Sequence, residues 1–234
     1  MNGLLDTFKD AKEYGSILTV DQYDWELLDR FVSNIEVVGQ MSMDTVGLDD
    51  TAEEVKQLIA QGKVLAQKYH VTITNPPYMG NNGMSVKLTD YLRKVYPNSK
   101  SDLYSVFIEC CGYTTLKHGF RAMITQHGWM FLSSFEKLRL SVENADIICM
   151  SHLGARAFDE ISGEVVQTTS FITRNSTYSG YKGTYVRLLT STSESGKEQL
   201  FLSGNSRFYS GRECFDMIPG EPIAYWFSER LLRV

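Results

Sequence analysis

Asn75, Pro76, Pro77 and Tyr78 form a short run of an amide, two prolines and an aromatic ring. The side-chain oxygen of Asn75 and the carbonyl oxygen of Pro76 can both accept hydrogen bonds from the N–H groups of an amine. Two such acceptors would draw a conjugated nitrogen toward tetrahedral geometry and disperse the charge that grows as it attacks a methyl group. The ring of Tyr78 would stack on a planar substrate, an interaction worth about 1–3 kcal/mol. The run could therefore support methyl transfer to a planar amine.

The elements around this run place it at the end of a strand. Residues 71–74 alternate valine or isoleucine with threonine, and the prolines stop the strand because proline donates no ladder hydrogen bond and fixes its own φ. Open α/β sheets bind ligands at the carboxyl ends of their strands. Asparagine and proline are also common in ordinary turns, so the four residues alone leave both interpretations open.

Several longer segments resemble a known family. Residues 69–80 look like motif IV of the amino-methyltransferases that use S-adenosylmethionine. Later motifs of these enzymes resemble three further segments of the chain, Asp102–Glu109, Met123–Met130 and Ser134–Arg139. A closer similarity is to the large adenine-specific DNA methyltransferases of BREX phage-defence systems (the PglX type), which are methylases of the restriction-modification kind. It is carried by Asn75–Arg139, His152–Phe158, Gly163–Phe171 and Ile218–Trp226.

The resemblance implies an activity and a set of site residues. The activity is transfer of a methyl group from S-adenosylmethionine to the exocyclic amine of an adenine in double-stranded DNA, in restriction-modification or phage defence. Because a base inside a duplex cannot present that amine, base flipping is implied. The catalytic residues would be Asn75, Pro76, Pro77 and Tyr78. Tyr78 and Phe158 would stack on the flipped base, while Asn75, Pro77 and Phe107 would contact the cofactor.

Two of these aromatic residues also have a simpler interpretation. Phe158 lies between strand-like segments and could be a buried loop residue. Phe107 has helical spacing, so it is expected in the core whether or not it also contacts the cofactor.

One feature of the family is missing from the sequence. Upstream of motif IV these enzymes carry a glycine-rich loop that holds the cofactor, but no two glycines in residues 1–69 lie within four positions of each other. We therefore expect a fragment that, by itself, binds S-adenosylmethionine weakly, is inactive and tends to self-associate. Its expected partners are the missing N-terminal half of the catalytic domain and a target-recognition domain.

Charge is distributed unevenly along the chain. Residues 1–70 hold 13 acidic and 6 basic side chains, a net charge of −7, whereas residues 71–234 hold 15 acidic and 17 basic, a net charge of +2. A domain that binds duplex DNA alone usually has a strong basic surface. Either DNA binding depends on other domains, or the substrate is not DNA.

Composition narrows the remaining possibilities. No apolar run is long enough for a membrane span and the N-terminus lacks a signal-peptide pattern, so a cytoplasmic protein with no membrane partner is expected. The four cysteines and four histidines show no metal-ligand spacing, which predicts neither a disulfide framework nor a bound metal.

The pattern of apolar residues predicts an α/β fold. Helices are expected over residues 24–38, 51–65, 84–95, 101–117 and 133–142. The second of these helices begins with a capping box at Thr51, and Ser101 caps the fourth. Strands are expected at 69–75 (buried), 120–126, 146–151, 165–174, 184–189 and 199–202. This alternation indicates a mostly parallel sheet, the C-terminal part of a Rossmann-like methyltransferase, that ends in an antiparallel hairpin. The predicted domains are an incomplete catalytic domain, residues 1–175, and a β-rich extension, 176–234, leading toward a target-recognition region.

Two other functions remain open from the sequence. The same run of residues 75–78 occurs in enzymes that methylate protein glutamine or RNA, because the glutamine amide poses the same electronic problem. A non-catalytic DNA-binding or scaffold fragment would explain the missing glycine loop, but it gives no reason to keep residues 75–78.

Overall fold

The computed structural model describes residues 2–41, 48–142, 144–158 and 166–227, and it describes side chains for residues 3–34 and from 51 onward within these ranges. The chain divides into two compact units, Met1–Gln67 and Lys68–Val234. No described helix has both the length and the apolar character needed to cross a bilayer.

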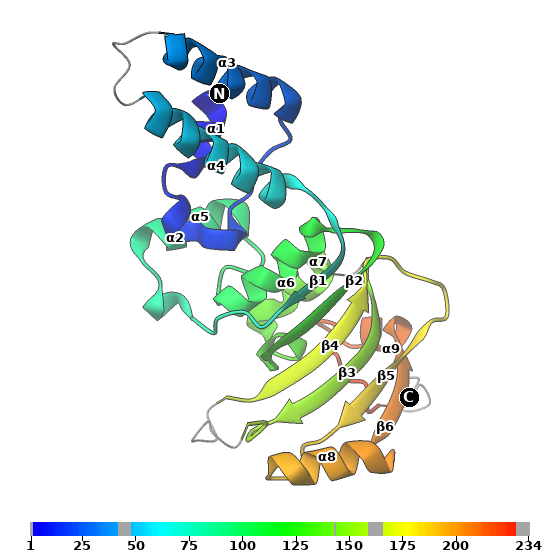
Figure 1. Ribbon diagram of the computed structural model, residues 1–234. Helices are drawn as coiled ribbons and strands as arrows, with labels where there is room; N and C mark the ends of the chain where they lie inside the picture. The colour runs from blue at the N-terminus through cyan, green and yellow to red at the C-terminus, as the bar shows by residue number, and fades with distance from the viewer. Residues whose placement is uncertain (1, 42–47, 143, 159–165, 228–234) are drawn as a thin grey trace. The chain divides into compact units, whose positions relative to one another are not determined.

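The first unit is helical. Its elements are α1 (Asn2–Phe8), α2 (Ala11–Tyr14), a 3-10 turn (Gly15–Ile17), α3 (Trp25–Met41) and α4 (Leu48–Ala66). Helices α3 and α4 pack side by side (Figure 1), and Lys63 of α4 forms a 2.6 Å ion pair with Asp29 of α3. The helix predicted from Asp24 is confirmed. The capping box at Thr51 is wrong, because α4 already begins at Leu48.

The second unit is built on a six-stranded sheet of order β1-β2-β4-β3-β5-β6. The strands are β1 (Tyr69–Thr74), β2 (Thr115–Gln126), β3 (Asp146–Gly154), β4 (Thr168–Arg174), β5 (Lys182–Arg187) and β6 (Arg207–Gly211). The helices are α5 (Val86–Val95), α6 (Leu103–Thr114), α7 (Glu136–Ser141), α8 (Glu194–Ser203) and α9 (Arg212–Asp216), with 3-10 turns at Asn81–Gly83, Gly128–Met130 and Ser133–Phe135.

Strand directions confirm the predicted α/β class. β1, β2, β3 and β5 run in one direction, while β4 and β6 run in the other, as the pairings of neighbouring strands require. The sheet is mostly parallel in this sense, although only β1–β2 and β3–β5 are parallel neighbours. The expected hairpin is confirmed, since β3 pairs antiparallel with β4.

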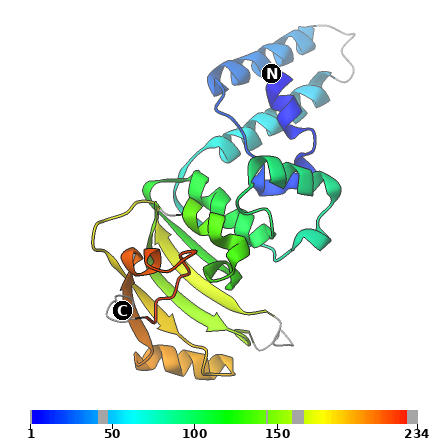
Figure 2. The ribbon, with the colours of Figure 1, turned by 180° about the vertical axis from the view of Figure 1, so that it is seen from behind.

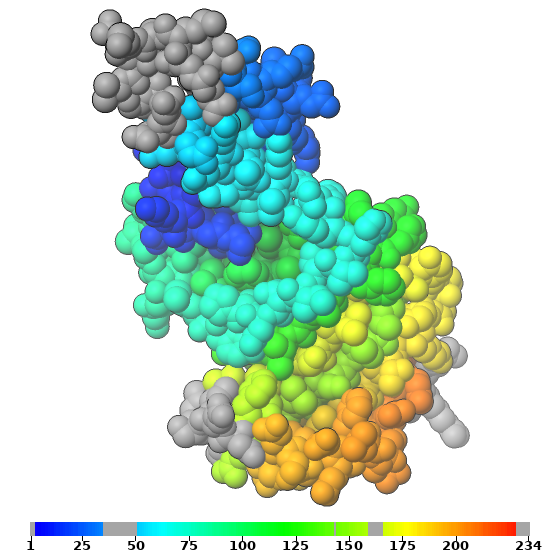
Figure 3. All heavy atoms as spheres, in the orientation of Figure 1, coloured from blue at the N-terminus to red at the C-terminus, as the bar shows by residue number. Residues whose placement is uncertain are grey.

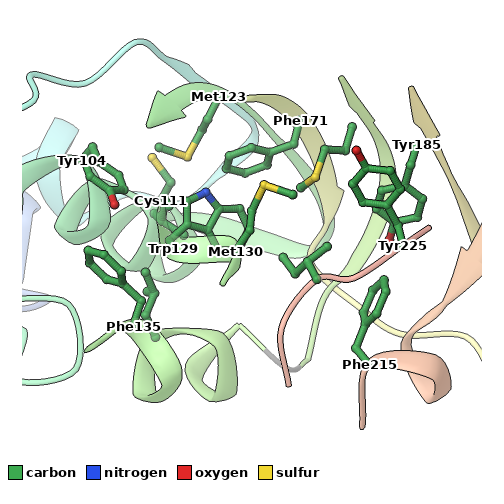
Figure 4. Close-up of a cluster of buried hydrophobic side chains, with 14 of the residues drawn as sticks. Tyr104, Cys111, Met123, Trp129, Met130, Phe135, Phe171, Tyr185, Phe215 and Tyr225 are labelled. Carbon is green, nitrogen blue, oxygen red and sulfur yellow. The ribbon is translucent and has the colours of Figure 1, made fainter. Parts of the chain in front are cut away.

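One face of the sheet carries the main core. Figures 1 and 2 show α6, α7 and α9 on this face. The close-up in Figure 4 shows the side chains that fill the space between them, with Trp129 and Met130 at the centre and Tyr185 stacked on Tyr225 at one end. On the opposite side, atoms of β3 and β4 reach the surface with no described helix of this unit over them (Figure 3).

The expectation that residues 69–75 form a buried strand is wrong. β1 lies at the edge of the sheet, and its Val71 and Ile73 side chains are 51% and 76% exposed. These residues have strand-forming apolar character, but among the described elements only β2 pairs with them.

Two further boundaries differ from the sequence-based expectation. Helix α6 begins after Asp102 rather than Ser101, and it ends at Thr114 because β2 starts at Thr115. Residues 199–202 are not a strand but belong to α8, where the Ser193 hydroxyl accepts a hydrogen bond from Gly196 N and Gly204 ends the helix in the left-handed conformation.

The extension predicted at residue 176 continues the same sheet. Its strands β5 and β6 follow β3 in the sheet order, and its helices are α8 and α9. The boundary of the compact units falls at Gln67/Lys68, so the proposed division at 175/176 concerns function and stays a prediction.

Candidate active site

The run Asn75–Tyr78 leaves the carboxyl end of β1, as the sequence predicted. Asn75 and Pro77 are exposed, Pro76 is buried and Tyr78 is half-buried. The alternation follows from the two prolines, which hold this segment extended so that successive side chains point to opposite sides. The amide of Asn75 is thereby presented to solvent at the carboxyl end of β1, the edge where open α/β sheets bind ligands.

Asp102 ties the loop after this run to the start of α6. Its carboxylate accepts hydrogen bonds from Met79 N at 3.1 Å and from Tyr104 N at 3.2 Å, and Leu103 N donates to Met79 O at 3.0 Å. Burial raises the pKa of Asp102, while the backbone N–H groups that donate to the carboxylate oppose that rise. One carboxylate therefore caps α6 and fixes the loop.

The ring of Tyr78 is supported from behind by Tyr104. The two rings meet edge to face with centroids 6.0 Å apart, and Tyr104 packs in turn on Phe135 at 5.7 Å. Tyr104 is fully buried in the cluster shown in Figure 4. Burial raises the pKa of both tyrosines, so they stay neutral phenols at physiological pH. This packing limits the orientations available to Tyr78.

Phe107 lies one turn after Tyr104 on α6. It is half-buried and packs against the core cluster, so its expected place in the core is confirmed. Residues three apart on a helix share a face, which places Phe107 on the side of α6 that carries Tyr104. Its contact with a cofactor stays a prediction.

Phe158 follows β3 at the same edge of the sheet as Asn75, because β1 and β3 run in the same direction. It is 39% exposed, so it is not a buried core residue. β2 and β4 lie between β1 and β3, which separates the strand ends by about 14 Å at the usual strand spacing. For Phe158 and Tyr78 to contact one base, the loop after β3 must reach toward β1.

The sequence analysis did not find a hydrogen-bonded chain of three side chains at this edge of the sheet. His127 Nδ1 lies 2.7 Å from His152 Nε2, and His152 Nδ1 lies 3.0 Å from the Tyr225 hydroxyl. His127 follows β2, His152 is on β3, and Tyr225 lies near the end of the described chain. The three residues are 25 and 73 positions apart, so no local spacing could have revealed the chain.

The electrostatics of this chain favour neutral imidazoles. Burial lowers the pKa of His127, and burial together with the charges of His127, Arg187 and Lys197 lowers the pKa of His152 to about 4. The next residue, Gly128, lies against Tyr104: a Cβ there would be 3.4 Å from the Tyr104 hydroxyl oxygen. The histidine chain thus adjoins the tyrosine that supports Tyr78.

The described residues contain no group of three or more histidine, cysteine or acidic side chains placed to hold a metal ion. The four cysteines, Cys110, Cys111, Cys149 and Cys214, are free thiols.

Comparison with known proteins identifies one family. The family described as Eco57I restriction-modification methylase matches residues 16–158. The chain is 41% identical over 242 residues to the adenine-specific methyltransferase PglX of Lacticaseibacillus casei (strain Zhang), covering 100% of this chain and 20% of that protein. It is 39% identical over 223 residues to the adenine-specific methyltransferase BrxX of Escherichia coli O9:H4 (strain HS), covering 94% and 18%. The chain thus spans about a fifth of the length of these curated relatives.

Solved structures share the fold at low sequence identity. A cryo-electron microscopy structure of a DrdV–DNA complex is 16% identical with a TM-score of 0.53, covering 76% of this chain and 20% of that one. A nuclease-deletion mutant of the Type ISP restriction-modification enzyme LlaGI is 14% identical with a TM-score of 0.50, covering 85% and 21%. These similarities establish a fold common to restriction-modification enzymes.

Proposed function

The chain belongs to the Eco57I restriction-modification methylase family, and from this we propose that it is part of an adenine-specific DNA methyltransferase that serves restriction-modification or phage defence. The observation that carries the proposal is the presentation of residues 75–78. Asn75 is exposed at the carboxyl end of β1, Asp102 holds the following loop, and Tyr104 supports the Tyr78 ring.

In the proposed reaction, Asn75 and Pro76 act on the exocyclic amine of adenine. The lone pair of that nitrogen is delocalised into the ring, which makes it a poor nucleophile. The Asn75 amide oxygen and the Pro76 carbonyl oxygen accept its two N–H groups and stabilise the positive charge that develops on the nitrogen. Pro76 is buried, so its carbonyl is held by a rigid, packed residue.

Tyr78 stacks on the flipped base and fixes its orientation. Extrusion is needed because the amine of a paired adenine is out of reach, and stacking on an aromatic ring offsets part of the lost base stacking. In this proposal Phe158 contacts the other face of the base.

We propose S-adenosylmethionine as the methyl donor. The residues present fit its adenine end: Pro77 is an exposed apolar residue beside Asn75, and Phe107 is half-buried on α6. When bound, this cofactor supplies a methyl group on a sulfonium centre. Asn75 positions the amine, and Pro77 and Phe107 bind the adenine ring of the donor. Double-stranded DNA is the proposed substrate partner.

Labelled S-adenosylmethionine tests the proposal directly. The chain is grafted in place of the matching region of the PglX relative, and the product is incubated with duplex DNA, RNA or protein. Label in adenine of DNA is expected. Label in RNA or in protein glutamine, with none in DNA, would contradict the DNA assignment and favour the other amino-methyltransferase functions.

A further inference from the structure

Three cationic side chains of the second unit are almost completely buried: Arg121, Arg139 and Lys197, with exposed fractions of 3%, 4% and 4%. A buried charge is costly unless hydrogen bonds compensate it. The guanidinium of Arg139 donates to the carbonyl oxygens of Trp129, Leu132 and Gly220 at 2.6–2.9 Å. The ammonium group of Lys197 donates to three carbonyl oxygens at 2.7–3.0 Å.

Arg121 differs from both. Its Nε is buried without a hydrogen-bond partner, and no described carboxylate forms an ion pair with its guanidinium. Burial lowers the pKa of Arg121 to about 10, so the group remains charged at pH 7. The neighbouring Cys111 cannot act as a counter-ion there, because burial raises the pKa of its thiol to about 11. The charge of Arg121 is therefore uncompensated by the described residues.

Arg121 lines a polar pocket of ≈190 Å³ at the C-terminal end of α6. At about 30 Å³ for each water molecule, this volume holds roughly six waters, enough for a small oxyanion and part of its hydration shell. Glu109 also lines the pocket, but its two carboxylate oxygens already accept hydrogen bonds from the hydroxyls of Ser99 at 2.5 Å and Tyr113 at 2.9 Å.

The absence of a side chain at Gly112 leaves room for the guanidinium of Arg121. Gly112 lies under the guanidinium: a Cβ at this position would come within 2.9 Å of an Arg121 terminal nitrogen.

We propose that the pocket around Arg121 is an oxyanion-binding site that takes a carboxylate or phosphate group. The guanidinium pairs with two oxygens of the group. The pocket lies at the opposite end of α6 from Asp102, about 15 Å along the helix at roughly 1.5 Å per residue. It is therefore separate from the candidate active site, and the inference does not depend on the proposed methylation.

Titration calorimetry with sodium phosphate and with sodium acetate, each at constant ionic strength, tests this site on the 234-residue chain. Saturable binding of at least one anion is expected, and the Arg121→Met variant should bind at least about tenfold more weakly. Lys94→Met, which removes an exposed cation from α5, is the matched control and should bind as the wild type does. Equal binding by wild type and Arg121→Met would overturn the proposal.

The source of the group needs its own comparison. Phosphate binding without acetate binding identifies a phosphate site, and the reverse identifies a carboxylate site. No binding of either anion by the wild-type chain overturns the proposal.

A second readout covers the case in which a variant misfolds. Gly112→Ala keeps Arg121 but places a methyl group against its guanidinium, and it should weaken anion binding while circular dichroism stays unchanged. Arg121→Met removes an uncompensated buried charge, so without added anion its urea midpoint should equal or exceed that of the wild type. A much lower midpoint would mean that Arg121 is already compensated, which contradicts the proposal.

Discussion

Asn75 offers an acceptor that cannot itself take up a proton at neutral pH. Its amide oxygen can orient an amine and stabilise the charge that grows on it, but the proton released after methylation must leave by another route. This limits the role of Asn75 to positioning and electrostatic stabilisation. Its exposure at the end of β1 leaves the amide oxygen accessible to a substrate.

Asn75→Ala should lower the rate of DNA methylation by roughly 10²–10³-fold, the usual effect of losing one preorganised polar group at a reacting centre. DNA affinity should change little, because Asn75 contacts only the amine. Methylation by the grafted enzyme and a gel-shift assay measure the two effects. Asn82→Ala, an exposed residue of the next turn, is the control. Undiminished methylation in Asn75→Ala would remove Asn75 from the site.

The chain from His127 through His152 to Tyr225 predicts a pH dependence of stability. The pKa of His152 is about 4 in the fold, below the 6.5 of a free imidazole. Below about pH 6.5 the unfolded chain therefore binds a proton that the folded chain resists, so stability is complete above that pH and falls as the pH drops. The loss is at most about 1.4 kcal/mol per pH unit for this residue, down to roughly pH 4.

Urea denaturation between about pH 7.5 and 4.5 measures this dependence. His152→Gln keeps a hydrogen-bonding side chain but does not titrate, so its stability should vary less with pH than that of the wild type between about pH 6.5 and 4.5. Identical profiles for the two proteins would show that His152 is not held neutral in the fold.

At the scale of elements, α6 connects the candidate site to the core. Asp102 caps its first turn and holds the loop after β1, Tyr104 supports Tyr78, and the rest of the helix packs on β2. Asp102 affects both elements because its carboxylate caps α6 and also accepts a hydrogen bond from Met79 in the loop after β1.

Asp102→Ala should destabilise the fold by about 1–2 kcal/mol, the usual cost of an N-cap, and also free the Met79 N–H. Methylation should fall more than this stability loss predicts at a temperature where the variant is folded, because the loop that carries Tyr78 is no longer fixed. Ser85→Ala, which removes the N-cap of α5, is the matched control and should lower stability without that excess loss of activity. An equal effect of the two variants on activity would rule out positioning by Asp102.

At the scale of the whole molecule, the sheet exposes an apolar edge and face. Val71 and Ile73 of β1 are exposed, and so are Phe120 and Ile172, which lie on the neighbouring strands β2 and β4. Contiguous apolar surface on an edge strand is a common site of association.

The 234-residue chain should therefore self-associate at micromolar concentration. Ile73→Lys places a charge on the exposed edge without disturbing the buried face of the sheet, and it should shift the chain toward monomer. Sedimentation velocity over a concentration series measures this. Leu202→Lys, a change at a 72% exposed residue of α8, is the control. A wild-type chain that stays monomeric at all concentrations would contradict the prediction.

The same chain should bind S-adenosylmethionine only weakly. The residues that we assign to the adenine ring of the cofactor are Pro77 and Phe107, and no glycine-rich loop occurs in residues 1–69. Charge-assisted hydrogen bonds contribute about 1.5–3 kcal/mol each, so two missing ones lower affinity by roughly two to four decades. Titration calorimetry measures the affinity. Micromolar binding by a monomer would show that residues 1–69 contain a cofactor site.

The sequence by itself determined the features that depend on neighbouring residues. The two prolines after Asn75 end β1 at Thr74 whatever lies around it. Apolar periodicity defines α3 and the β3–β4 hairpin, because these signals act within one element. Residues 199–202 show the limit of such signals: their apolar character suits a strand, yet the Ser193 cap and the carbonyl oxygens around Lys197 hold them in α8.

Only the tertiary structure decided which distant side chains meet. His127, His152 and Tyr225 come together because β2 and β3 flank β4 and bring their ends to one edge of the sheet. The exposure of β1 and the uncompensated burial of Arg121 likewise depend on which elements pack on the sheet. Contacts of this kind are set by strand order and helix packing, and residue type or spacing along the chain carries no record of them.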